Sequence, residues 1–184
     1  VVGTTVKKQY KYGHIIIAGL LIGILFTPSM TSANRMFDTQ FPGLEVAGEY
    51  IKAHSNTDEM IFFPSHQSYG VLWHADRKGL KTPPTLELFK QGETKYNVQW
   101  LYLYQWGLAL VENKEVWPYV TNNYHLELVT FQLSGQQATP IGILLKRGGN
   151  YTDDDLNTLL QTGTPKTTTY EYTYGTQTLQ TVTK

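Results

Sequence analysis

The sequence contains no cysteine, and this absence removes two groups of proteins from consideration. Disulfide-stapled secreted folds and metal sites with thiolate ligands both require cysteine. The chain also has no excess of positive charge, because 15 Lys and Arg residues balance 15 Asp and Glu residues. The composition therefore gives no indication of nucleic-acid binding.

Motifs of common active sites are missing as well. The sequence has no glycine-rich phosphate loop, no nucleotide-binding fingerprint and no G-x-S-x-G nucleophile elbow. His66, His74 and Asp76 lie near enough in sequence to suggest a triad with Ser65 or Ser68. We favour polar surface residues at a helix start for this group. We therefore expect no catalytic residue, no metal site and no cofactor in this chain.

What the sequence does contain is a continuous apolar run from Ile15 to Phe26. Twelve helical residues rise only ~18 Å, but extension to residues 12–30 gives ~28 Å, close to the hydrocarbon thickness of a bilayer. Gly19 and Gly23 form a G-x-x-x-G pattern, which suits close packing against another membrane helix. The run predicts a transmembrane helix over residues 15–30, with the lipid bilayer and other transmembrane helices as partners.

Two alternatives to an anchor remain open at this stage. The basic residues before the run and the small residues of "TPSMTSAN" after it are typical of a signal peptide cut after Ala33. A buried helix of a soluble domain is the other alternative. We favour the anchor, because a signal peptide starts at an initiator Met and this chain begins at Val1, as a piece of a longer protein does.

The distribution of charge predicts the orientation of the anchor. Lys7, Lys8 and Lys11 precede the run without any acidic residue, whereas 15 acidic residues and 12 Lys and Arg residues follow it. Positive charge is retained on the cytoplasmic side of membrane helices. We therefore expect residues 1–14 to form a cytoplasmic basic segment at the cell membrane, and residues 37–149 to form an extracytoplasmic domain.

Helical and strand patterns alternate after the anchor, which is typical of a small Rossmann-like α/β domain. Helices are expected within residues 41–55, 82–97 and 113–124, and strands within residues 59–65, 98–106, 125–134 and 139–149. The stretch 66–79 fits either a helix or a strand. Residues 150–184 form a Thr-rich tail, in which we expect a helix capped by Thr152 and Asp155 and a hairpin around Gly175, or else a loose tail.

Two groups of residues are candidates for ligand contact. Arg77, Lys78 and Lys81 lie in "DRKGLK", which suits a phosphate group, although a solvated loop has the same composition. Trp100 and Tyr102 share one face of the strand 98–106 with Tyr104 and Trp106, and an open face of this kind stacks on sugars. Leucines on the opposite face favour core packing for that strand.

The order of these segments resembles the C-terminal region of polytopic membrane glycosyltransferases of the protein mannosyltransferase and lipid A aminoarabinose transferase type. The resemblance covers residues 14–149 and rests on "FPGLEVAGEYIKAHSNTDEMIFFPS", "YGVLWHADRKG", "PPTLELFK", "KYNVQWLYLY", "NNYHLELVTF" and "IGILLKRGG". It implies sugar transfer from a polyprenyl-phosphate donor to an extracytoplasmic acceptor, with a divalent metal in some relatives.

The same resemblance implies that this chain is non-catalytic, because the acidic catalytic residues of that family lie near the N-terminus of the full protein. No such region is present here, so no catalytic residue is carried over. Two other classes stay open. One is a membrane-anchored or secreted module that binds a carbohydrate or a protein, and the other is a structural subunit that packs its apolar helix on a partner.

The expected topology is testable with single cysteines, since the chain has none of its own. Cysteines introduced at Thr5 and Thr39 should differ in labelling by an impermeant thiol reagent on intact cells, with only position 39 labelled. Equal labelling would contradict the anchor. An N-terminus at Asn34 in the mature protein would instead establish a cleaved signal.

Overall fold

The structure is a computed structural model that describes residues 13–64, 69–135, 137–172 and 175–184. The chain divides into two compact units, residues 1–37 and 38–184, and each is considered by itself. The basic segment with Lys7, Lys8 and Lys11 lies largely outside the described residues, and so does His66.

Helix α2, Gly13–Gln40, carries the apolar run. Its window Ile15–Ser32 is long and apolar enough to cross a membrane, and none of it is buried in the chain's own fold. This confirms one apolar helix near the N-terminus that is compatible with membrane anchoring. The helix continues ten residues beyond the end that the sequence predicts, residue 30.

Polar residues within this apolar helix satisfy their hydroxyl groups inside the helix itself. Thr27, Ser29 and Thr31 each donate a hydrogen bond to the carbonyl four residues earlier, at 3.4, 2.7 and 3.0 Å. Such bonds are how hydroxyl side chains are accommodated in hydrocarbon. Gly19 and Gly23 have open space at the position of a Cβ atom, which leaves room for close approach of another helix.

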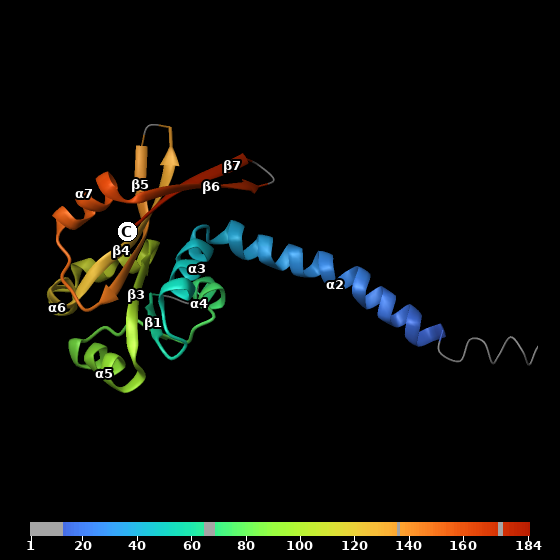
Figure 1. The fold of residues 1–184 in the computed structure, drawn as a ribbon, viewed down its shortest axis with the longest axis horizontal. Helices are drawn as coiled ribbons and strands as arrows, with labels where there is room; N and C mark the ends of the chain where they lie inside the picture. The colour runs from blue at the N-terminus through green and yellow to red at the C-terminus, as the bar shows by residue number, and fades with distance from the viewer. Residues whose placement is uncertain (1–12, 65–68, 136, 173–174) are drawn as a thin grey trace, which may run out of the picture. The chain divides into compact units, whose positions relative to one another are not determined.

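The second unit is an α/β domain with a mixed seven-stranded sheet in the order β2-β1-β3-β5-β4-β7-β6 (Figure 1). The elements follow the chain as α3 Leu44–His54, β1 Met60–Phe63, α4 Tyr69–Ala75, β2 Gly79–Lys81, α5 Leu86–Tyr96, β3 Val98–Tyr104, the 3-10 helix η2 Gln105–Glu112, α6 Val116–Asn123, β4 Tyr124–Ser134, β5 Gln137–Arg147, α7 Asp153–Thr162, β6 Thr164–Tyr172 and β7 Gly175–Thr183. The α/β class and the expected helices and strands are therefore confirmed.

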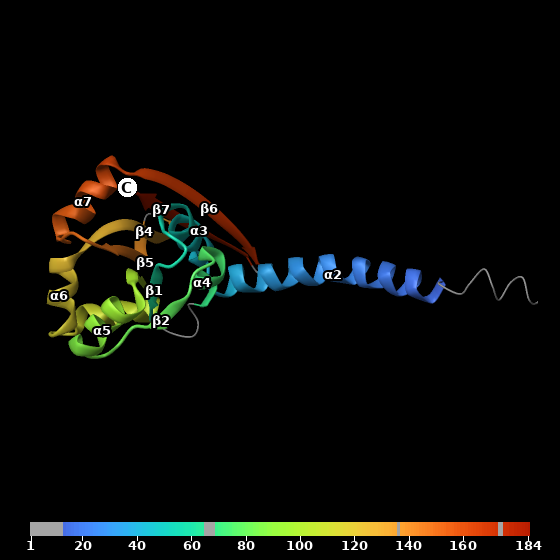
Figure 2. The same cartoon turned by 60° about the horizontal axis from the view of Figure 1, so that its bottom comes forward.

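Strand β1 lies between two parallel neighbours, β2 and β3. From β1 the chain crosses to its neighbour β2, and from β2 it crosses back past β1 to β3, the neighbour on the other side of β1. Because such crossovers are right-handed, connections in opposite directions place their helices on opposite faces. Helix α4 accordingly packs with α3 on one face, and α5 covers the other together with α6 and α7 (Figure 2).

The sheet separates two apolar layers that meet at β3. Trp100, Tyr102 and Tyr104 face α3 and α4, whereas Leu101 and Leu103 face α5 and α6. All five side chains are completely buried. The prediction of core packing for this strand is confirmed, since helices cover both of its faces.

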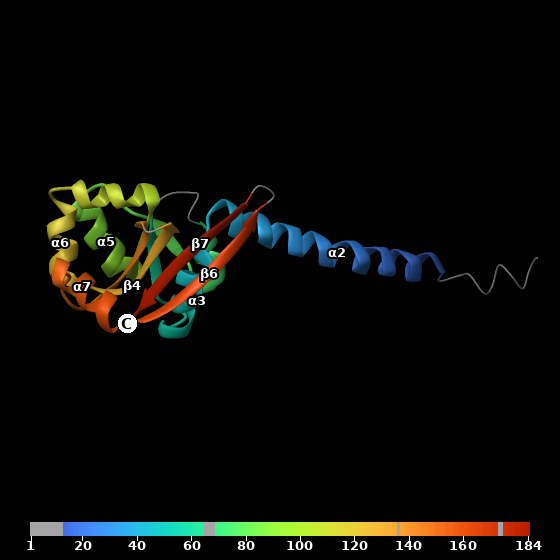
Figure 3. The ribbon, with the colours of Figure 1, turned by 90° about the horizontal axis from the view of Figure 1, so that it is seen from above.

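The sheet continues beyond residue 149, where the sequence places the end of the domain. Helix α7 begins with a capping box formed by Thr152 and Asp155. Strands β6 and β7 form a long hairpin, and β7 pairs with β4 along six residues (Figure 3). Leu179 and Val182 of β7 are buried on opposite faces of the sheet. The Thr-rich residues are thus an integral edge of the sheet.

Two elements, β2 and η2, were not predicted. Strand β2 has only three residues, too few for an alternating pattern to be visible. In the ambiguous stretch 66–79, the described residues form helix α4 from Tyr69 to Ala75, and only Gly79 belongs to β2. Helix η2 follows β3 directly, and its 3-10 geometry has no 3.6-residue period.

Removing buried volume from β3 should destabilise the whole domain. Leu103→Ala should lower the free energy of unfolding by about 2 to 5 kcal/mol, because the leucine is completely buried and leaves a cavity. Leu88→Ala on α5, where the leucine is 48% exposed, should cost under about 0.5 kcal/mol. Chemical unfolding of the full chain in detergent micelles measures both, and equal losses would contradict the central position of β3.

Candidate functional site

The turn at residues 41–43, which follows α2, is held by a cluster of hydrogen bonds. The Tyr104 hydroxyl at the end of β3 donates to the Pro42 carbonyl at 3.0 Å. The Gly43 N–H group lies 3.1 Å from both the Glu45 carboxylate and the Tyr170 hydroxyl, and Tyr170 also donates to Glu45. We call Gly43, Glu45, Tyr104 and Tyr170 the entry cluster.

Glycine is required at the centre of this cluster. Gly43 has φ 93°, in the left-handed region that side chains disfavour. A Cβ atom here would also approach Leu179 Cδ1 to 3.0 Å. The turn before helix α3 therefore depends on the absence of a side chain at Gly43.

The entry cluster lies at the carboxyl end of β3, next to the carboxyl end of β1. The direction of the connections reverses between these two strands. The chain runs from β1 to β2 on one side of β1, and then from β2 to β3 on the other side of β1. In open α/β sheets, ligands bind outside the carboxyl ends of the strands at such a switch point. This edge, from Phe63 to Tyr104, is the candidate functional site. Residues 65–68, which follow β1, are outside the described residues.

Tyr102 adds an unpaired hydroxyl group close to this edge. It is completely buried, its ring stacks on that of Tyr104 at 5.9 Å, and its hydroxyl has no hydrogen-bond partner. Burial, with Tyr104, Glu45 and Tyr170 as further causes, raises the pKa of Tyr102 well above its usual value. The phenol is therefore neutral, and its full burial leaves it out of contact with any ligand at the surface.

The structure gives Arg77 of the "DRKGLK" group a structural position. Its guanidinium donates to Ser55 Oγ and to the carbonyls of Ser55, Asn56, Ala75 and Asp76 at 2.9 to 3.3 Å. These bonds join the end of α3 to the end of α4. Lys78 and Lys81, at the two sides of Gly79, are exposed.

The aromatic candidates are closed to solvent. Trp100 is completely buried, and its indole N–H donates to the Glu59 carboxylate at 2.7 Å. Lys146 Nζ lies 4.6 Å from the Trp100 ring centre. Since Tyr102 is also completely buried, neither ring has an open face for stacking on a sugar. The side chain of Trp106 is outside the described part of the chain.

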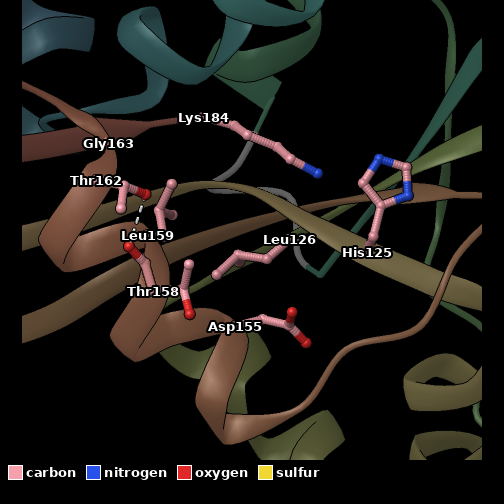
Figure 4. A pocket seen from close by; sticks show the side chains of 8 residues that line it. All are labelled: His125, Leu126, Asp155, Thr158, Leu159, Thr162, Gly163 and Lys184. Atoms are coloured by element: carbon pink, nitrogen blue, oxygen red, sulfur yellow. Dashed lines mark hydrogen bonds between the residues drawn. The ribbon is translucent and has the colours of Figure 1, made fainter.

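A small cavity lies between α7 and the ends of β4 and β7. Figure 4 shows the Lys184 side chain extending toward the His125 ring, with Asp155 on the α7 wall. Its volume of about 140 Å³ is below the ~300 to 1,000 Å³ that are usual for small-molecule sites. Asp155 is engaged in the capping box with Thr152, so its carboxylate already has partners.

His125 belongs to a chain of three hydrogen-bonded side chains that the sequence analysis missed. His125 Nε2 lies 2.6 Å from Glu127 Oε1, and the Tyr50 hydroxyl donates to Glu127 Oε2 at 2.5 Å. Burial and the Glu127 carboxylate raise the pKa of Tyr50. His125 and Glu127 are two residues apart on β4, where the register shifts between Leu126 and Leu128, so their contact is made at an irregularity of the strand. A carboxylate that orients an imidazole is one part of an acid–base site.

A second buried carboxylate serves the opposite layer. Glu93 on α5 accepts hydrogen bonds from the hydroxyls of Tyr119 and Tyr124, both at 2.6 Å, and lies 3.7 Å from Arg147 Nε. Desolvation and the hydrogen bond to Glu93 raise the pKa of Tyr119 to about 12. The pKa of Tyr124 is also raised, first by burial. The carboxylate thereby joins α5 to α6 and β4.

Among the residues that the structure describes, no group of three or more His, Asp or Glu side chains is arranged to hold a metal ion. Comparisons of the whole chain with protein-family models, with curated proteins and with solved structures gave no match.

The position of Arg77 predicts a stability defect. Arg77→Lys should lower the free energy of unfolding by about 1 to 3 kcal/mol, because lysine cannot reach all five acceptors and leaves carbonyls unpaired. Lys78→Gln, at the exposed neighbour, should change it by less than about 0.5 kcal/mol. Thermal unfolding in detergent micelles provides the measurement. An Arg77→Lys variant that unfolds normally but loses binding of inorganic phosphate would identify Arg77 as a ligand contact.

Proposed function

We propose that this chain is the non-catalytic, membrane-anchored part of a membrane glycosyltransferase, which moves a sugar from a polyprenyl-phosphate donor to an extracytoplasmic acceptor. The domain's role is to cover the active site in the membrane and to help choose the acceptor. This proposal places Phe37 and the residues after it outside the cell, and it needs no metal or cofactor in this chain.

The observation that carries the proposal is the entry cluster. An apolar helix of membrane-spanning length is followed by a turn whose hydrogen bonds to Glu45, Tyr104 and Tyr170 lie at the switch point of an α/β sheet. A domain that covers a membrane-embedded site needs its switch point close to the residues where the chain enters it, and the entry cluster lies there.

The partners of the ionisable groups support a non-catalytic role. Glu59, Glu93 and Glu127 each accept two hydrogen bonds from neighbouring side chains, and Arg77 donates only to groups that end helices or link them. These bonds connect elements of the fold. Within the described residues, the cavity beside His125 is too small for a lipid-linked sugar.

A ligand-binding module without enzymatic activity is the second candidate. The observation that favours it is the same cavity, in which the oriented imidazole of His125 and the amine of Lys184 come together (Figure 4). Its size suits a small anion or a single side chain of a partner. This candidate requires no membrane-embedded enzyme next to the domain.

The test is an assay of lipid-linked sugar turnover with three samples: the full-length polytopic protein, the same protein ended after Met30, and residues 1–184 alone. The full protein should turn over, and its truncation should lose at least about tenfold, or ~1.4 kcal/mol of activation free energy. Residues 1–184 alone should be inactive. Within the full protein, Tyr170→Phe should lower turnover because it releases the entry turn, whereas Tyr96→Phe, at a 42% exposed tyrosine, should not.

Turnover by residues 1–184 alone would place an active site in this chain. A full protein without further membrane helices would end the glycosyltransferase proposal and leave the ligand-binding module. Equal effects of Tyr170→Phe and Tyr96→Phe would show that the entry cluster is unimportant for turnover.

A further inference from the structure

Helix α4 exposes two aromatic side chains on one face. Trp73 is 72% exposed, more than any other large apolar residue that the structure shows exposed, and Tyr69 is 51% exposed. The two are four residues apart, so they are neighbours on the helix surface. We call Tyr69 and Trp73 the aromatic pair. Tryptophan is seldom left this open to water, because its ring is among the largest apolar surfaces in a protein.

The aromatic pair is held firmly, because α4 packs tightly on α3. A Cβ atom at Gly48 of α3 would meet His74 Cβ at 2.5 Å and the Val71 carbonyl at 2.8 Å. A Cβ atom at Gly70 of α4 would meet Leu44 Cδ1 at 2.9 Å. The small residues therefore allow close approach of the two helices, and the aromatic pair points away from this contact with a fixed orientation.

The contact with Leu44 places α4 against the first residue of α3, four residues after the end of α2 along the chain. From Ser32 to Gln40, helix α2 rises only ~12 Å. The four residues from there to Leu44 span at most ~14 Å. The path along the chain from Ser32, the last residue of the membrane-spanning window, to Leu44 is therefore at most ~26 Å. Helix α4, which contacts Leu44 and carries the aromatic pair, is itself only ~10 Å long.

Exposed basic charge lies on the neighbouring strand. Lys81 at the carboxyl end of β2 is exposed, and β2 is packed against α4 through Gly79 and Leu72. Lys78 at the start of that strand is exposed as well. Tryptophan and tyrosine concentrate at the membrane–water interface, and lysines there attract anionic lipid headgroups.

We propose that the aromatic pair, with the exposed lysines of the neighbouring strand β2, is a second membrane contact that inserts into the headgroup layer. Other exposed apolar residues, Leu88, Tyr96 and Leu160, lie on the helices α5 and α7 that cover the other face of the sheet. The aromatic pair differs from them because Trp73 is the most exposed of these side chains and because exposed lysines lie on the strand next to α4. This inference rests on the membrane anchor of the proposed function.

The test uses single cysteines that carry a small fluorescent label, since the chain has no cysteine of its own. Three variants of the full chain, Trp73→Cys, Leu160→Cys and Leu21→Cys, are placed separately in vesicles of phosphatidylcholine and phosphatidylglycerol with a nitroxide group on some headgroups. Leu160 is a matched control because it is 47% exposed on α7. A label at position 73 should be quenched at least about twofold more strongly than one at position 160, as an interfacial site requires.

The outcomes separate the inference from the anchor on which it rests. In one outcome, the aqueous quencher does not reach the label at position 21, and the nitroxide lipid quenches the labels at positions 73 and 160 equally. This outcome would overturn the second contact but leave the anchor in place. A label at position 21 that the aqueous quencher reaches freely would overturn the anchor as well. Protection of position 73 that increases with the amount of protein per vesicle would identify a second copy of the chain as the occupant, and would overturn the contact with lipid.

Discussion

The complete burial of β3 on both faces is the constraint on which the rest of the domain depends. A strand with large side chains on both faces must have a helical layer on each. Here β3 also separates two kinds of sheet, because it pairs parallel with β1 and antiparallel with β5. The parallel half needs crossover helices, which supplies α4 and α5. In the antiparallel half, β4 with β5 and β6 with β7 form hairpins with short connections, while η2 with α6 and then α7 connect the other strands.

Aromatic side chains in such a core bring polar groups inside, and glutamates provide the acceptors. Trp100 donates to Glu59, Tyr124 to Glu93, Tyr50 to Glu127 and Tyr170 to Glu45. Each bond joins two different elements, so that a buried N–H or O–H group is satisfied and two layers are fixed together. In each of these bonds the glutamate accepts from an aromatic side chain that is distant in sequence. The shared pattern explains why several tyrosines have a raised pKa, since each faces burial or a carboxylate.

The sequence was sufficient where a pattern is local. The 3.6-residue spacing from Leu44 to Ile51 predicted α3, and apolar residues on both faces from Val98 to Tyr104 predicted the central strand. It was insufficient for three-residue β2 and for the pairing of β7 with β4, because neither leaves a periodic pattern of its own. The entry cluster was out of reach for a different reason: Glu45 and Tyr170 are 125 residues apart. The pair His125 and Glu127 did have a signal, the two-residue spacing along a strand.

The Thr-rich end of the chain contributes Tyr170 to the entry cluster. Tyr170 of β6 holds Gly43 and Glu45, while Leu179 of β7 packs against the Cα side of Gly43, so the last hairpin supports the first turn of the domain. Loss of the hairpin would remove the hydrogen bond from the Gly43 N–H group to the Tyr170 hydroxyl. That bond supports the left-handed conformation of Gly43. The conformation of the first turn of the domain therefore depends on residues more than a hundred positions later. The N-terminal turn and the C-terminal hairpin form one structural unit, because neither keeps all its hydrogen bonds without the other.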